Sequence, residues 1–214
     1  MTAADRDIGD GTAASTPRAK GRPPTLTEKQ IVDAALAVIR TEGLEALTMR
    51  RFARELGRSQ MAVYSHVADK QQLLDLVARA TMADVEIPTE GSWEERLRTL
   101  IDNIDRQLRR QPGIAGLLLQ RMLHADQRIV DAVMEILLDA GLCERDALLA
   151  YAMIHTYLFG RYQVTMAPEA AVDSDLPPTL ARVTPHLALL RGADYFNFGI
   201  DTLIDGIRAR LTAV

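Results

Sequence analysis

Apolar residues recur every three to four positions along most of the chain, which is the spacing of a helix with one buried face. The start of the first such run offers two capping boxes, Thr25 with Glu28 and, two residues later, Thr27 with Gln30, and Gly43 ends the pattern. These signals predict a helix over 28–41. Its inward face consists of Ile31, Ala34, Ala35, Val38 and Ile39.

Similar runs, separated by glycine, proline or short polar segments, continue to the end of the chain. Thr48 and Ser59 are suitable N-caps for two short helices, Gly57 ends the first of them, and Ser92 with Glu95 forms another capping box. The further helices are expected over about 49–56, 60–67, a stretch following residue 69, 93–110, 114–122, 126–140, 144–166, 179–190 and 193–212.

This pattern indicates an all-α protein. No segment shows the alternation of a convincing strand, and no internal repeat is visible. We expect a disordered tail with a basic arm over 1–24, a small helical domain over 25–80 and a larger helical domain over 81–214. Residues 167–178 contain three prolines and three acidic residues, so they are expected to form an exposed loop.

Composition excludes several classes of protein. Apolar residues make up 48% of the 214 residues, which is ordinary for a globular protein. No stretch approaches 18 uninterrupted apolar residues, and the N-terminus lacks the apolar core of a secretory signal, so we expect a cytoplasmic protein with no membrane partner. Cys143 is the single cysteine, which excludes an internal disulfide; neither a metal site nor a cofactor is expected.

Charge is divided unevenly along the chain. The net charge of −4 by itself argues against a nucleic-acid partner. Residues 18–80, however, hold 11 Lys or Arg against 7 Asp or Glu, a net charge of +4, whereas residues 81–214 hold 13 against 19, a net charge of −6. This difference suggests two modules with different partners; chance variation of a few charges is the alternative.

Residues 49–67 have the layout of a helix-turn-helix with a tight turn at Gly57. Val63 and Val67 lie four positions apart, so they share one face of the second helix and are expected to point inward. The apolar residues on which they are expected to pack are Leu47, Phe52 and Leu56.

The outward face of the second helix is then rich in groups that contact DNA. Gln60 can pair with adenine, and Met61 and Ala62 can touch thymine methyl groups. Phosphates can be bound by hydroxyl, imidazole and cationic groups and by the positive end of the preceding helix. The candidates for this second role are Thr48, Arg50, Tyr64, His66 and Lys70. A generic three-helix packing unit with an incidentally polar helix is the alternative.

The run LTMRRFARELGRSQMAVYSHVADKQQLLDLV, residues 47–77, resembles the DNA-binding domain of the TetR family of bacterial repressors. The shared features are a Leu-Thr-x-Arg opening, a Leu-Gly turn, an Ala-aliphatic-Tyr-x-His-Val recognition helix and a Lys-x-x-Leu-Leu start to the next helix. The resemblance extends back through 31–43 and so covers about 50 contiguous residues.

This resemblance implies roles for individual side chains. Base-facing positions are occupied by Arg50, Gln60, Met61 and Ala62, and backbone-holding positions by Thr48, Tyr64, His66 and Lys70. Arg58 departs from the family pattern, which has an apolar residue after the turn glycine, and its side chain is expected to extend toward solvent or a phosphate. Arg18, Lys20 and Arg22 form either an arm that reaches the duplex or an unstructured, solvated segment.

Residues 81–214 contain neither a nucleophile elbow nor a metal-ligand spacing, so we expect no enzyme. His124, His155 and His186 are interpreted as core or surface residues. The family resemblance implies a ligand-binding domain that also dimerises, and flexible Met side chains suit an adaptable, mostly apolar pocket. Candidate ligand contacts, each with ordinary core packing as its alternative, are Leu108, Leu117, Met122, Met134, Leu138, Met153, Tyr157 and Phe159.

The last predicted helix carries an apolar stripe and a second stripe of small residues. Each of its two interior glycines costs about 1 kcal/mol relative to alanine, which is easier to understand where another backbone approaches closely. We therefore expect a dimer interface formed with helix 144–166; intramolecular packing is the alternative. The interface candidates are Gly160, Gly199, Thr202, Gly206 and Ala209.

Together these features predict a homodimeric, DNA-binding transcriptional regulator. The expected form is a repressor that a small, mostly apolar effector releases from a palindromic operator in double-stranded DNA. Two alternatives stay open: a DNA-binding regulator without a ligand, and a helical enzyme or scaffold that does not bind DNA.

Overall fold

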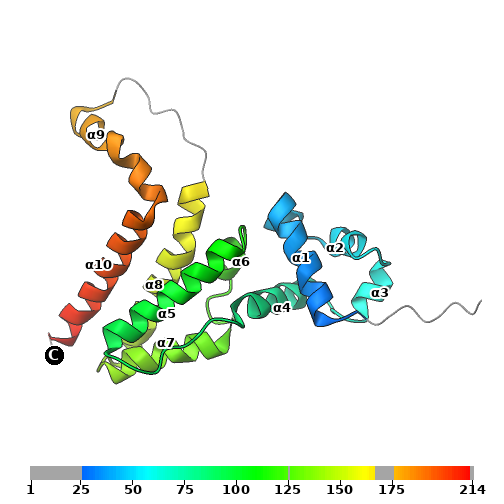
Figure 1. Ribbon diagram of the computed structural model, residues 1–214, viewed down its shortest axis with the longest axis horizontal. Helices are drawn as coiled ribbons and strands as arrows, with labels where there is room; N and C mark the ends of the chain where they lie inside the picture. Colours follow the sequence, from blue (N-terminus) through cyan, green and yellow to red (C-terminus); the bar gives the residue numbers. More distant parts are fainter. Residues whose placement is uncertain (1–25, 125, 167–175, 213–214) are drawn as a thin grey trace, which may run out of the picture.

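The computed structural model describes residues 26–124, 126–166 and 176–212, and all regular elements within these ranges are helices (Figure 1). The predicted tail and arm, including Arg18, Lys20 and Arg22, and most of the predicted loop lie outside the described residues. The elements are α1 (Glu28–Glu42), the 3₁₀ segment η1 (Leu44–Ala46), α2 (Met49–Glu55), α3 (Gln60–Tyr64), α4 (Lys70–Met82), α5 (Trp93–Arg110), α6 (Ala115–Leu119), α7 (Gln127–Asp139), α8 (Glu144–Met166), α9 (Pro178–Val183), the 3₁₀ segment η2 (Thr184–Arg191) and α10 (Ala193–Leu211).

Side-chain caps set the start of each of the first five α-helices. Thr27 and Ser92 form the predicted capping boxes of α1 and α5. Thr48, Ser59 and Asp69 each accept a hydrogen bond from a backbone N–H in the first turn of α2, α3 and α4. Because these N–H groups have no partner within their own helix, a local sequence signal is enough to place the helix start.

Three elements differ from the expected lengths. α6 ends at Leu119 instead of continuing to residue 122. α3 ends at Tyr64 instead of continuing to residue 67, and the hydroxyl of Ser65 donates to the carbonyl of Ala62 at 2.8 Å. The helix expected over 179–190 is divided into α9 and η2. Pro185 lies at this division, where its missing N–H and its ring are incompatible with a continuous α-helix.

The helices are arranged in two groups joined by α4. Figure 1 shows α1, α2 and α3 together at one end and the helices from α5 onward in a larger body. α4 packs on α1 and also contacts α5 and α6, while α8 packs on α6, α7 and α10. Buried apolar residues form one connected core from α1 to α10. Among the described residues, no helix is long and apolar enough to cross a bilayer.

Candidate nucleic-acid interface and ligand cavity

The turn between α2 and α3 sets the orientation of the predicted recognition helix. Gly57 has a φ of +61°, in the left-handed region that favours glycine. The N–H of Arg58 donates to the carbonyl of Ala53 at 3.0 Å, which closes the turn. Val63 and Val67 are each 1% exposed, as predicted, and they hold one face of this segment in the core.

The opposite face of α3 is open to solvent. Met61 is 80% exposed and Tyr64 is 44% exposed. Gln60 and His66 are also exposed, and Ala62 is half-buried. A large apolar side chain as exposed as Met61 suits a surface that a partner covers, and thymine methyl groups in a major groove would cover it.

Two neighbouring arginines in the first turn of α2 have different environments: Arg51 is bound within the protein, and Arg50 is a candidate DNA contact. The guanidinium of Arg51 lies 2.6 Å from the carboxylate of Glu42 and 2.7 Å from that of Glu55, which ties α2 to α1. The hydrogen bond from Arg51 lowers the pKa of Glu42. Arg50 is exposed, and Thr48, which caps the helix, is exposed beside it.

The remaining basic candidates near α3 are less exposed. Lys70 begins α4 and is half-buried. Arg58 is also half-buried. The departure of Arg58 from the apolar family pattern is therefore accommodated while the turn keeps its hydrogen bonds.

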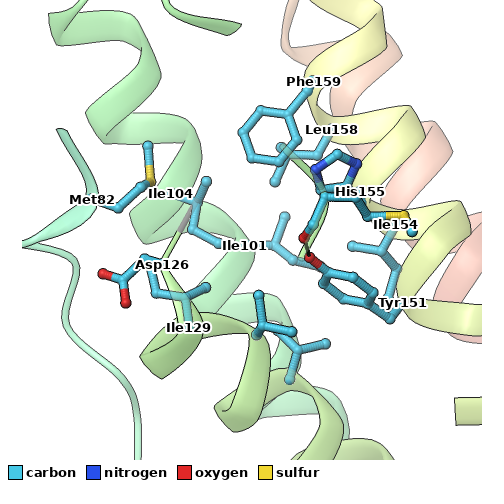
Figure 2. A pocket seen from close by; sticks show the side chains of 13 residues that line it. Met82, Ile101, Ile104, Asp126, Ile129, Tyr151, Ile154, His155, Leu158 and Phe159 are labelled. Atoms are coloured by element: carbon cyan, nitrogen blue, oxygen red, sulfur yellow. Dashed lines mark hydrogen bonds between the residues drawn. The ribbon is translucent and has the colours of Figure 1, made fainter. Parts of the chain in front are cut away.

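A small apolar cavity of about 40 Å³ lies between α5, α7 and α8 (Figure 2). One wall is aromatic, because Tyr151, His155 and Phe159 recur at steps of four on α8. Their ring centroids are 5.8 Å apart for Tyr151 and His155, and 4.7 Å apart for His155 and Phe159. The rest of the lining is Met82, Ile101, Ile104, Met122, Asp126, Ile129, Val130, Val133, Ile154 and Leu158.

Two polar groups of the aromatic wall bind backbone carbonyls. The Tyr151 hydroxyl donates to the carbonyl of Met122, and Nε2 of His155 lies 3.1 Å from the carbonyl of Leu118 in the last turn of α6. Burial raises the pKa of Tyr151 to about 12 and lowers the pKa of His155, which the bond to Leu118 partly offsets. A neutral His155 that donates from Nε2 keeps Nδ1 as an acceptor for a ligand.

The cavity contains only part of the predicted ligand contacts. Met122 and Phe159 line it. Leu108 is buried and lines a separate cavity next to the end of α1. The other five are placed in the core, on the surface or along a groove between α8 and α10: Leu117, Met134, Leu138, Met153 and Tyr157. The prediction missed Tyr151 and His155, although aromatic residues at steps of four are a sequence signal that rings share one helix face.

The C-terminal end of α4 is held by side chains from the body. The guanidinium of Arg128 on α7 donates to the carbonyls of Val85, Met82 and Ala83 at 2.9, 3.1 and 3.3 Å. The side-chain amide of Gln107 on α5 donates to the carbonyl of Thr81 at 2.9 Å. Since the last carbonyls of a helix lack partners within it, these bonds from other helices fix where α4 ends.

A second arginine binds α4 nearer its start. Arg121, in the connection between α6 and α7, lies 3.2 Å from Asp75 and hydrogen-bonds Gln71. The same connection contributes Met122 and Asp126 to the cavity lining. One segment of the body therefore contacts both the cavity and the helix that leads to α3.

An exposed apolar groove of about 900 Å³ runs between α8 and α10. Phe198, which is 72% exposed, lines it together with three of the interface candidates, Gly199, Thr202 and Gly206. A Cβ added to Gly199 would overlap the ring of Tyr157, whereas one added to Gly160 or Gly206 would meet nothing within 4 Å. Packing within the chain therefore explains Gly199 but not Gly160 or Gly206.

Known proteins share both parts of this architecture. Residues 31–77 match the family described as bacterial regulatory proteins, tetR family, and residues 87–211 match the tetracyclin repressor-like C-terminal domain. The tetracycline repressor protein class D of Escherichia coli is 30% identical over 202 residues, which cover 88% of this chain and 92% of the relative.

Relatives from Streptomyces show the same similarity. The HTH-type transcriptional repressor DrrR1 of Streptomyces coeruleorubidus is 28% identical over 214 residues, covering 88% of this chain and 79% of the relative. The crystal structure of the TetR family protein ActR of Streptomyces coelicolor in complex with actinorhodin is 27% identical, with a TM-score of 0.68, and covers 87% of this chain and 98% of that one.

Proposed function

Because the chain belongs to the TetR family, and is a DNA-binding transcriptional regulator and not an enzyme, we propose that a flat, mostly apolar effector releases it from its operator. The observation that carries this proposal is the course of α4. The helix follows α3 directly in the chain, beginning at Lys70, and it ends at Met82 in the lining of the cavity. A displacement of the cavity wall can therefore move α4, and with it the helices that read DNA.

The DNA-reading part is assigned to residues 25–80, which include most of the positively charged segment. Two copies place their α3 helices in successive major grooves, so the operator is a palindrome with half-sites about one helical turn apart. The protein acts as a repressor in the cytoplasm. The proposed base contacts are Arg50, Gln60, Met61 and Ala62, and the proposed phosphate contacts are Thr48, Tyr64, His66 and Lys70.

Residues 81–214 are assigned to dimerisation and effector binding. The apolar groove between α8 and α10 supports a homodimer, because a second copy would cover Phe198 and approach Gly206 without a clash. The effector class follows from the two walls of the cavity. Aromatic rings on α8 facing aliphatic side chains of α5 and α7 suit a flat ring system. The similarity to ActR, whose structure contains actinorhodin, supports a small-molecule effector.

The size of the cavity supplies a mechanism for release. Ligand sites in proteins measure about 300–1,000 Å³, whereas this cavity measures about 40 Å³. A ligand must therefore move the walls apart. It competes with two backbone carbonyls for the side chains of Tyr151 and His155: one in the α6–α7 connection, bound by Tyr151, and one at the end of α6, bound by His155. The effector favours the widened conformer because it binds that conformer more tightly. The contacts that Arg121 in the α6–α7 connection makes with α4, and that Arg128 on α7 makes at its end, change with the conformer.

The proposal is tested first by selecting binding sites from a random pool of DNA duplexes at moderate salt. We expect an inverted repeat, and we expect the double substitution Gln60→Ala and Tyr64→Ala to abolish its selection. Absence of duplex binding by the wild type, or binding that the double substitution leaves intact, would contradict a DNA-reading role for α3.

The effector is then sought by adding flat aromatic compounds to the selected complex. Release by at least one of them, lost when Val133→Trp fills the cavity, supports the proposed site. Operator binding that no compound changes would favour a ligand-independent regulator with a cavity that serves only packing.

A further inference from the structure

A second and larger cavity, of about 690 Å³, lies where the DNA-reading end meets the body. Its volume is within the range of small-molecule sites. One side comes from the end of α1 and from η1, and the other from the end of α5, the α5–α6 turn, α6 and α8. Figure 1 shows α1 and α6 on the two sides of this junction. Within the described part of the chain, the larger cavity shares no lining residue with the cavity between α5, α7 and α8.

The floor of this junction cavity is apolar and well supported. Ile39, Leu108 and Leu119 contribute to its surface. A Cβ added at Gly113 would lie 3.3 Å from Cγ2 of Ile39, so the α5–α6 turn directly touches α1 at this point. The cavity is therefore bounded by two parts of the protein that are in van der Waals contact at its base.

Behind the body side of the cavity, a cluster of one carboxylate and two guanidinium groups carries surplus positive charge. Asp105 and Arg161 are buried, whereas Arg109 is exposed. Asp105 is 4% exposed and accepts hydrogen bonds from Nε of Arg109 at 2.7 Å, from the Tyr162 hydroxyl at 2.8 Å and from Arg161. One carboxylate thus serves two guanidinium groups. Arg161 is 7% exposed, and its Nε has no hydrogen-bond partner among the described residues. Arg109 and Tyr162 extend from this cluster to line the cavity.

The opposite wall adds another positive charge. Arg40, in the last turn of α1, lines the cavity from the DNA-reading side, and among the residues that the structure describes Glu45 is the one acidic side chain of the lining. Three glutamine amides complete the polar part of the lining: Gln111, Gln120 and Gln163. The junction cavity therefore combines an apolar floor with guanidinium groups from both sides.

We propose that the junction cavity binds an organic carboxylate with an apolar body, held by Arg40 and Arg109. Guanidinium groups bind carboxylates through paired, charge-assisted hydrogen bonds, and these are strengthened beside an apolar surface. Arg109 keeps its terminal nitrogens for such a ligand, because its bond to Asp105 uses Nε. A ligand bound in this way joins α1 to α5 and stabilises the orientation of the DNA-reading end that it bridges.

Isothermal titration of the full-length protein with 2-naphthoate and with its uncharged analogue 2-naphthamide tests this site. We expect the acid to bind at least about tenfold more tightly than the amide, since hydrogen bonds to charged groups are stronger than those between neutral groups. Arg40→Gln and Arg109→Gln should each weaken binding of the acid about tenfold and leave the amide unaffected, while Arg109→Lys retains part of the affinity.

The neighbouring Arg110 provides a matched control, because it is exposed on the same helix and does not line the cavity. Arg110→Gln should bind the acid as the wild type does, and melting temperatures show whether each variant is folded. Val133→Trp, which fills the other cavity, should leave binding of the acid unchanged. Equal binding of acid and amide, no binding of the acid, or indifference to both Arg40→Gln and Arg109→Gln overturns the proposal. None of these measurements uses DNA, so they are independent of the proposed repressor function.

Discussion

Single side chains on the exposed face of α3 are assigned to different parts of a DNA duplex. Gln60, the first residue of α3, is proposed to pair with an adenine. Gln60→Ala is then expected to cost about 1–3 kcal/mol of binding and to relax the preference for one base. Repeating the selection from random duplexes with the variant measures both effects. An unchanged preference at all positions would show that Gln60 does not read a base.

Lys70 is assigned to a phosphate, so its replacement has a different signature. Lys70→Gln should weaken all duplexes alike and reduce the slope of log affinity against log salt by about one. Arg79→Gln serves as the control, because Arg79 is exposed further along the same helix. If the two variants lose equal affinity, the effect of Lys70 reflects overall charge and not a local contact.

The lowered pKa of His155, which lines the cavity, should make the stability of the protein depend on pH. Burial holds the pKa of His155 in the folded chain below the ordinary 6.5. At a pH between this lowered pKa and 6.5, the unfolded chain therefore binds more protons than the folded chain. The free energy of unfolding should therefore fall as the pH decreases through about 6.5, a direction set by proton uptake in the unfolded state.

Chemical denaturation at about pH 7.5 and about pH 5.5 measures this change. His155→Gln, which can still donate to the carbonyl of Leu118, should show a flatter pH dependence. The same slope in both proteins would assign the pH dependence to other groups.

At the scale of elements, α4 depends on hydrogen bonds from neighbouring helices. Arg128→Met removes the guanidinium that donates to three carbonyls at the end of α4; of these, the carbonyl of Met82 keeps the hydrogen bond from the N–H of Val85. Because Arg128 is partly exposed, we expect a loss of roughly 1–2 kcal/mol in stability and faster amide exchange over 79–85. Arg128→Lys should restore part of the protection, since one ammonium group can bond fewer of the carbonyls.

Arg96 provides a control for the effect of Arg128 on α4. It forms an ion pair with Asp139 that joins α5 to α7 and does not involve α4. Arg96→Met should destabilise the protein without selectively increasing exchange at the end of α4. Equal exchange in the Arg96 and Arg128 variants would show that Arg128 contributes only general stability.

At the scale of the whole molecule, the two glycines of α10 have different expected roles. Gly206→Leu should leave the fold intact and dissociate the dimer, because Gly206 has open space within its own chain. Gly199→Ala should lower the melting temperature, since its Cβ would overlap the ring of Tyr157. Analytical ultracentrifugation and thermal unfolding separate the two effects. A Gly206→Leu dimer of unchanged affinity would exclude this groove as the interface.

The sequence by itself determined where the capped helices begin and which face of α3 points inward. Caps such as Thr27 and Ser59 act on backbone groups within one turn, and the spacing of Val63 and Val67 defines a face without reference to the rest of the chain. The motifs around Gly57 were also sufficient for the family, because a tight turn and its flanking residues are contiguous in sequence.

Only the tertiary structure decided which apolar faces meet in the core, in a cavity or at the surface. Met122 and Phe159 line the cavity between α5, α7 and α8, whereas Leu138 and Met153, with equally apolar side chains, are 42% and 60% exposed. The junction cavity likewise joins α1 to helices that follow it by many residues. A helical period reports that one side of each helix is apolar, but the neighbour that covers that side is set by long-range packing.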